Sequence, residues 1–268
     1  MIEDFARTLA REVPGAVAVL FYGSCLRESR AGGPRAGGIA DLYVLTQTPR
    51  GPADRVLAPT VHFREGDGVT AKVAVMPLAA FTRAMDRRAL ATHLWARFCQ
   101  PVAVVWTRDT AAARAVDTAL GKAGRTAAWW AERLAPAGSE AETAFEILFC
   151  HTYGAELRAE RDDRPRRLVE AAPDHWRRLA KDGFTAPGPA ERAAAARAWA
   201  LRRRLGKPLA ALRLIKAAFT FEGGAAYLAW KIERHTGHRL ALTPWQRRHP
   251  LLAALPLLVR LRRAGIIR

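Results

Sequence analysis

The chain carries Leu20-Phe-Tyr-Gly-Ser-Cys25 and, after a glycine-rich segment, the stretch Ile39-Ala-Asp-Leu-Tyr-Val-Leu45. The apolar run that ends at Gly23 predicts a buried strand closed by a turn, and the second stretch predicts a neighbouring strand with one carboxylate. Glycine lets a backbone approach a phosphate closely, while serine and turn amides donate hydrogen bonds to its oxygens. Aspartate offers a hard oxygen ligand to Mg²⁺. Gly23, Ser24 and Asp41 therefore predict a phosphate and metal site, although a Gly-Ser pair alone would equally fit an ordinary turn.

The segments around these two strands predict an α/β (α+β) fold for residues 1–125. Apolar runs bounded by glycine or proline indicate strands, and amphipathic stretches between them indicate helices. From residue 126 the spacing becomes helical, so we expect a mostly helical domain at 126–205 and a basic helical region at 206–268. The predicted strands are 16–22, 39–46, one within 69–76 and one within 101–106; the predicted helices include 2–13, those between 78 and 98, one from 110 onward, 191–205 and two within 209–237.

The net charge of +18 is concentrated in the last quarter of the chain. Basic residues outnumber acidic ones by 17 to 11 in residues 1–125 and by 16 to 2 in residues 195–268, whereas residues 126–194 carry 10 basic and 12 acidic side chains. Such an excess favours a polyanionic partner: a nucleic acid, an anionic membrane surface or a phosphorylated substrate. The alternative is compositional bias, because arginine greatly outnumbers lysine and alanine is abundant, as in proteins from GC-rich genomes.

Cysteine usage and hydropathy indicate a cytoplasmic protein. Cys25, Cys99 and Cys150 are widely spaced and odd in number, so they predict neither a disulfide framework nor a metal knuckle. The longest uncharged stretches fall short of the roughly 18 to 20 residues that cross a bilayer as a helix. The apolar, arginine-studded segment 251–268 instead predicts contact with the surface of an anionic membrane.

The Gly-Ser turn followed by a strand with an aspartate resembles the nucleotidyltransferase superfamily. Two positions depart from that pattern. Members usually carry a second acid two residues after the first, where this chain has Tyr43, and a third acid on a later strand, where the candidate strand offers Lys72. A two-metal site would therefore lack ligands. The superfamily pattern alone leaves a degenerate nucleotide-binding protein open.

Four short blocks follow one another along the chain: Tyr22-Gly23-Ser24, Asp41-Leu42-Tyr43-Val44, Tyr153-Gly154-Ala155-Glu156-Leu157-Arg158 and Lys216-Ala217-Ala218-Phe219-Thr220. Together they resemble the mitochondrial-type phosphatidate cytidylyltransferases, the peripheral CDP-diacylglycerol synthases of the translocator-maintenance family. The third block has Glu in place of that family's Asp and one residue fewer before it. The fourth lacks the Ala-Gly pair that usually follows it.

This resemblance implies a Mg²⁺-dependent transfer of CMP from CTP to phosphatidic acid, giving CDP-diacylglycerol and pyrophosphate at the inner membrane. Asp41 is then the metal ligand, with Glu156, or else Glu28 or Glu222, in place of the missing second acid. Lys72, Arg158 and Lys216 neutralise the departing pyrophosphate. Tyr22, Gly23 and Ser24 form the turn that holds the triphosphate.

Three other functions remain open at the level of sequence. The first is a nucleotidyltransferase with another phosphorylated acceptor, and the second is a catalytically inactive nucleotide-binding protein. Nucleic-acid binding is the least favoured, because no recognised nucleic-acid module is present, and we expect no nucleic-acid partner. The histidines lack the spacing of a zinc site. The sequence does not predict an oligomeric state.

Overall fold

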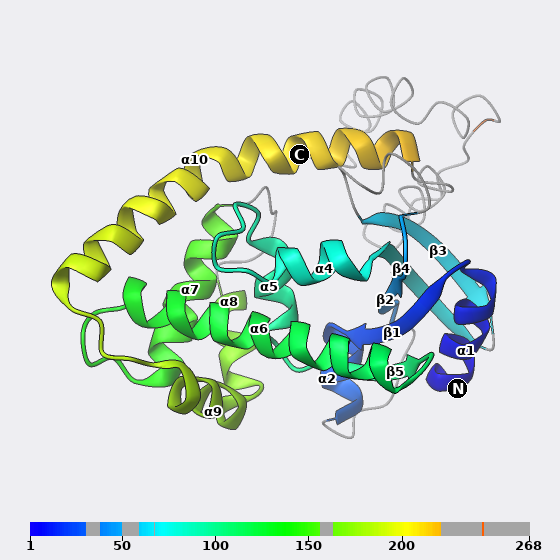
Figure 1. The fold of residues 1–268 in the computed structure, drawn as a ribbon, viewed down its shortest axis with the longest axis horizontal. Coiled ribbons are helices and arrows are strands. Elements are labelled where there is room, and N and C mark those ends of the chain that lie inside the picture. The colour runs from blue at the N-terminus through cyan, green and yellow to red at the C-terminus, as the bar shows by residue number, and fades with distance from the viewer. Residues whose placement is uncertain (31–37, 50–58, 67, 156–162, 221–242, 244–268) are drawn as a thin grey trace, which may run out of the picture.

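The computed structural model describes residues 1–30, 38–49, 59–66, 68–155, 163–220 and 243. It contains a five-stranded mixed sheet in the order β3-β4-β2-β1-β5 (Figure 1). Strand β1 (Ala16–Tyr22) pairs antiparallel with β2 (Ala40–Thr46) and with β5 (Ala103–Thr107). Strand β4 (Val69–Pro77) runs parallel to β2 and antiparallel to β3 (Thr60–Gly66). The predicted α/β fold is confirmed.

The register of the central strands places three predicted site residues in one row across the sheet. Tyr22 lies opposite Asp41, and Asp41 lies opposite Lys72 on β4. Residues directly opposite each other share a face of the sheet, so these side chains are neighbours. A slip of one residue would turn Asp41 to the other face, which makes the β1–β2 register a condition for the site.

Helices cover both faces of the sheet, which explains why β1 is buried along its whole length. On one face, α1 (Ile2–Glu12) packs Phe5 and Leu9 into a cluster with alternate residues of β1, β2 and β4. The opposite face, which includes Leu20 and Tyr43, packs with Phe81 and other residues of the following helices. Strands buried on both faces appear in a sequence as continuous apolar runs, and that is the pattern that made β1 and β2 predictable.

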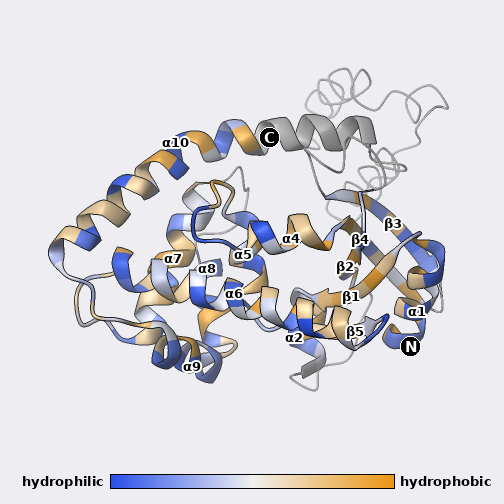
Figure 2. Cartoon of the chain, in the orientation of Figure 1, coloured by the Kyte–Doolittle hydropathy of each residue, from blue (hydrophilic) through white to orange (hydrophobic). Residues whose placement is uncertain are grey.

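The helices after the sheet share its hydrophobic core. The predicted domain boundary between residues 125 and 126 falls inside one long helix, α6, which packs against both the sheet and the later helices. Hydrophobic and hydrophilic residues alternate along α6 and α10, as expected of helices with one face on a core (Figure 2). The remaining helices are α2 (Ser24–Arg30), α4 (Leu78–Ala84), α5 (His93–Phe98), α6 (Thr110–Leu134), α7 (Ala141–Gly154), α8 (Arg164–Glu170), α9 (Pro173–Gly183) and α10 (Pro189–Thr220).

Two features differ from the sequence prediction. Strand β3 was not expected, because His62, Arg64 and Glu65 interrupt its apolar pattern; it lies at the end of the sheet order, where one edge needs no partner. Helix α10 continues through Pro208 to Thr220, where separate helices had been predicted on either side of the proline. The end of α10 reaches β3 (Figure 1).

The predicted membrane-contact segment 251–268 and most of the basic region 206–268 lie outside the described residues. Within the part of the chain that is described, no helix combines the length and the apolar character needed to cross a bilayer.

Candidate functional site

The turn after β1 is built around Gly23 and the carboxylate of Asp41. Gly23 has a φ of +87°, a conformation that residues with a side chain rarely adopt. A Cβ atom at Gly23 would lie 2.6 Å from Oδ2 of Asp41, closer than nonbonded atoms approach. Glycine is therefore required here for two independent reasons, and the turn and the carboxylate form one unit.

Asp41 lies in a cavity of about 190 Å³ whose lining joins the sheet to the helices. Burial raises the pKa of the Asp41 carboxyl group above its ordinary value. Four cationic side chains oppose that effect, in the order Lys72, Arg97, Arg164 and Arg27. The carboxylate is thus held in a partly desolvated position and surrounded by positive charge.

The four cations come from four different elements and all line this cavity. Arg27 lies on α2, Lys72 on β4, Arg97 on α5 and Arg164 at the start of α8. Against the single negative charge of Asp41, the described lining carries a net charge of +3 at neutral pH. Crowding of like charges also shows at Arg27, whose pKa is lowered by burial and then by Arg164. An excess of fixed cations in a concave, half-enclosed position is the property of a site for a polyanion.

Two tyrosines connect the site to the core. The guanidinium of Arg97 lies 5.4 Å from the centre of the Tyr22 ring, a cation–π contact that positions this arginine. Burial raises the pKa of Tyr22, so its hydroxyl stays protonated at physiological pH. Tyr43, at the position of the missing second acid, is 1% exposed and packs between Phe81 and Phe98. Tyr43 is therefore an aromatic residue of the hydrophobic core.

The structure brings Tyr22, Gly23, Ser24, Asp41 and Lys72 together in the lining of one cavity, as the sequence predicted for their neighbourhood. The other predicted residues are not among the described residues of this lining. Glu28 is exposed on α2 and lines a different cavity, and Lys216 belongs to α10 but its side chain is not described. Arg158, Glu156 and Glu222 lie outside the described residues, so their roles stay predictions.

Three cations of the site were missed from the sequence. Arg27 follows Ser24 by three residues at the start of α2, a spacing that places both on one face of a helix and could have indicated it. Arg97 and Arg164 belong to α5 and α8, which meet the strand ends only through tertiary packing, and no local motif marks them.

The described side chains contain no cluster of three or more His, Cys, Asp or Glu residues able to hold an ion. The absence of a zinc role for the histidines stays a prediction. His235, His238 and His249 lie outside the described part of the chain. Cys25, beside the turn, donates a weak hydrogen bond from Sγ to the carbonyl oxygen of Ile39 at 3.2 Å, a structural role. The exposed Cys150 and buried Cys99 are likewise free thiols.

No protein-family model matches the chain, and no curated protein matches its sequence. Among solved structures, the chain is similar to a nucleotidyltransferase-like protein from Exiguobacterium sibiricum 255-15, with 12% sequence identity and a TM-score of 0.30. The match covers 100% of this chain and 93% of the other. A likeness at this level carries no weight for the site, which rests on the geometry described above.

The two glycines that flank β1 provide a direct test of the turn. Gly15 and Gly23 both have positive φ angles, but a Cβ at Gly15 would meet no atom within 4 Å. Either substitution by alanine costs roughly 1–2 kcal/mol of stability from backbone strain, and only Gly23→Ala also displaces the Asp41 carboxylate. We expect Gly23→Ala to weaken binding of inorganic triphosphate at least tenfold, measured by isothermal titration calorimetry, and Gly15→Ala to bind it as the wild type does. Equal affinities in the two folded variants would show that the Gly23 turn is not part of an anion site.

Proposed function

We propose that this protein is a cytidylyltransferase that transfers CMP from CTP to phosphatidic acid. The observation that supports the proposal is the convergence of four cations on a half-buried Asp41 beside the Gly23-Ser24 turn. The resemblance of four sequence blocks to the phosphatidate cytidylyltransferases indicates the two substrates, CTP and phosphatidic acid. The cations of the cavity suit a nucleoside triphosphate, because its several negative charges must be balanced by fixed positive charges.

The donors around Asp41 suit a Mg²⁺ ion that arrives with the nucleotide better than an ion held by protein alone. Mg²⁺ is usually bound through one or two carboxylates together with substrate phosphates. Asp41 supplies one carboxylate, and the hydroxyl of Ser24 is a second oxygen in the same lining. Such an ion would neutralise part of the triphosphate charge. Glu156 as a further ligand belongs to this proposal.

The chemistry requires positioning and charge neutralisation rather than a general base. An oxygen of the acceptor phosphate forms a bond to the α-phosphorus of CTP, the bond from that phosphorus to the bridging oxygen breaks, and pyrophosphate leaves with the electron pair. A phosphate monoester has its second pKa near about 6, so the nucleophile is already ionised at neutral pH. Gly23 and Ser24 orient the triphosphate, while Lys72, Arg97 and Arg164 stabilise the charge on the leaving group. Arg158 and Lys216 would supply further positive charge to stabilise the leaving pyrophosphate.

The buried Tyr43 favours a second candidate, a nucleotide-binding protein without transferase activity, because it removes the second acid on which two-metal catalysis depends. A transferase with another phosphorylated acceptor is the nearest variant of the main proposal. Incubation of the purified protein with Mg²⁺, each labelled nucleoside triphosphate and phosphatidic acid, followed by product identification, separates them. Formation of labelled CDP-diacylglycerol supports the proposal, and binding of CTP without any transferred CMP supports the inactive protein.

Replacement of Asp41 by asparagine tests the metal ligand. We expect Asp41→Asn to lower turnover on the order of a hundredfold or more, since a neutral amide is a poor ligand for a hard cation. Burial raises the pKa of Asp41 in the folded state, so the ionised carboxylate disfavours folding at neutral pH and this effect disappears on acidification below the ordinary value of 3.8. The variant should therefore melt at pH 7 no lower than the wild type, with the difference shrinking toward low pH.

Asp117→Asn is the matched control for this variant, because Asp117 is exposed on α6 and does not line the cavity. Turnover of the Asp41→Asn variant close to that of the control at limiting Mg²⁺ would remove Asp41 from the metal site.

Attachment to an anionic membrane surface at the inner membrane is the last part of the proposal, and it rests on the sequence of residues 251–268. Each arginine near such a surface contributes about 1 kcal/mol. Combined replacement of Arg260, Arg262 and Arg263 by alanine should weaken co-sedimentation with anionic liposomes on the order of a hundredfold. Combined replacement of three exposed cations, Arg166, Arg177 and Lys181, is the charge-matched control. The surface contact is refuted if both triple variants bind the liposomes alike.

A further inference from the structure

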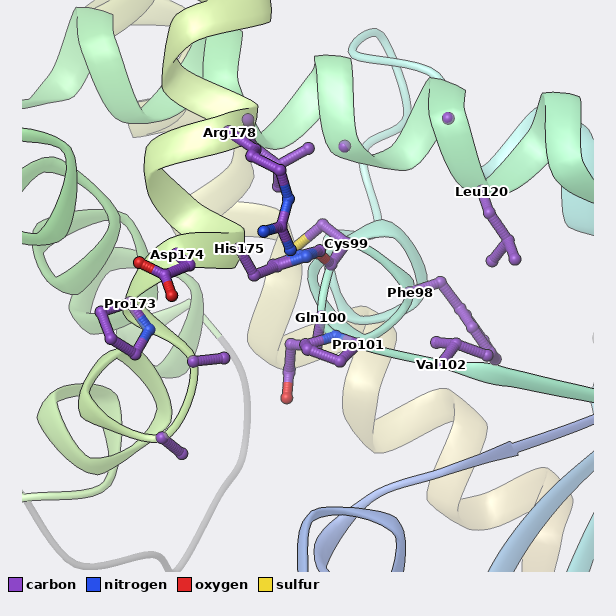
Figure 3. A pocket seen from close by; sticks show the side chains of 15 residues that line it. Phe98, Cys99, Gln100, Pro101, Val102, Leu120, Pro173, Asp174, His175 and Arg178 are labelled. Atoms are coloured by element: carbon purple, nitrogen blue, oxygen red, sulfur yellow. The ribbon is translucent and has the colours of Figure 1, made fainter. Parts of the chain in front are cut away.

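A second, larger cavity shares the lining residue Gln100 with the cavity around Asp41. Figure 3 shows this larger cavity from close by. Its volume is about 600 Å³, compared with about 190 Å³ for the cavity around Asp41. Ligand sites in proteins commonly measure roughly 300–1,000 Å³. The Asp41 cavity is small for a nucleotide and an acceptor together, and the larger cavity supplies additional space beside it.

The segment from α5 to β5 forms the wall between the two cavities. Ala96 and Arg97 line the Asp41 cavity, whereas the residues that follow line the larger one, and Gln100 lines both. The side-chain amide of Gln100 donates a hydrogen bond to the carbonyl oxygen of Ala96 at 3.0 Å, which fixes this side chain at the boundary. Phe98 in the lining of the larger cavity therefore directly follows Arg97, a cation of the Asp41 cavity, in the chain.

Apolar side chains form much of the lining of the larger cavity, and a glycine of α6 leaves room between them. A Cβ atom at Gly121 would meet only the end of the flexible Arg125 side chain, at 3.3 Å, so close packing does not require glycine here. Glycine inside a helix costs about 1 kcal/mol relative to alanine. Gly121 instead leaves space unfilled in the larger cavity, which it lines. The apolar residues around it are Phe98, Pro101, Val102, Leu120 and Leu179.

The polar side of the cavity lies at the start of α9. His175 Nε2 lies 2.7 Å from the carbonyl oxygen of Cys99, a hydrogen bond that ties α9 to the end of α5. The side chain of Arg178 extends toward these two residues (Figure 3). Within the described residues, Arg178 has no hydrogen bond or ion pair, whereas its neighbour Arg177 pairs with Glu142 at 2.7 Å.

Among the described residues that line this cavity, Asp174 carries a negative charge. This charge does not neutralise Arg178. The side chain of Asp174 is 79% exposed and pairs with Arg177 at 3.2 Å. The cavity thus combines an apolar wall with a guanidinium available to an oxygen atom of a ligand. That combination suits an amphiphilic molecule with polar oxygens at one end of an apolar body.

We propose that this cavity holds the apolar body of the phosphorylated acceptor, with its phosphate passing Gln100 to reach the Asp41 cavity. Arg178 binds the acceptor's other polar oxygens at the solvent-exposed side. This inference rests on the proposed transferase function, because it assigns the acceptor of that reaction to a place in the fold. The triphosphate of CTP and its Mg²⁺ bind in the Asp41 cavity.

Binding measurements on the full-length protein separate this proposal from the reaction itself. Soluble dihexanoyl phosphatidate, below its micelle concentration, is titrated into the wild type and into Arg178→Ala, Arg177→Ala and Gly121→Leu. Arg177→Ala removes the same charge from the same turn of α9. Arg177 does not line the cavity, and its partner Asp174, which does, is 79% exposed to solvent. We expect Arg178→Ala and Gly121→Leu to lose at least tenfold in affinity for this lipid and Arg177→Ala to keep it. Affinity for CTP with Mg²⁺ should be the same in all four proteins.

Three results would overturn the acceptor cavity: no binding of dihexanoyl phosphatidate to the wild type, equal affinity in Arg178→Ala and Arg177→Ala, or loss of CTP affinity in Arg178→Ala. The last would assign the cavity to the nucleotide. Arg178 is exposed, so its variant tests the proposal even if Gly121→Leu fails to fold. Failure of the proposed function has a different signature, in which the lipid binds as expected but no CMP is transferred to it.

Discussion

The contact between the Asp41 carboxylate and the backbone of Gly23 is the constraint on which the site depends. The absence of a Cβ at Gly23 lets a partly desolvated carboxylate lie against the end of β1. Burial makes this position unfavourable for a negative charge, and four cations from separate elements offset part of the effect. The cations need the carboxylate in the same way, since four positive charges in one small cavity repel one another.

The same contact relates the fold to the site. Because Asp41 lies opposite Tyr22 and Lys72, the register of three strands determines which groups meet at the cavity. The α5–β5 segment then carries Arg97 over the Tyr22 ring, and buried Trp95 and Phe98 anchor that segment in the core. Since this segment also lines the larger cavity, its packing sets the geometry of both cavities at once. The helices contribute Arg164 and the start of α9, so the helical part completes a site that begins on the sheet.

Local sequence patterns were sufficient to predict the site residues that lie on, or directly after, the central strands. Gly23 and Ser24 directly follow the short apolar strand β1, Asp41 lies on the short apolar strand β2, and Lys72 lies on the next strand in the row. Arg97 and Arg164 depend on how helices pack against strand ends, which no short motif encodes. Strand β3 lies at the end of the sheet order and has only two strongly apolar residues, Val61 and Phe63, so alternation of apolar residues was too short to indicate it. Pro208 predicted a helix break, but it lies at an exposed position of α10, where the helix continues past it.

The central claim is that the Asp41 cavity binds the triphosphate of a nucleotide. A crystal structure of the full-length protein with Mg²⁺ and a non-hydrolysable analogue of CTP tests this most directly. The account predicts the triphosphate between the Gly23 turn and the guanidinium groups of Arg97 and Arg164, with Mg²⁺ at about 2.1 Å from an oxygen of Asp41. A nucleotide bound elsewhere, or a triphosphate in the cavity whose metal ion does not contact Asp41, would contradict it.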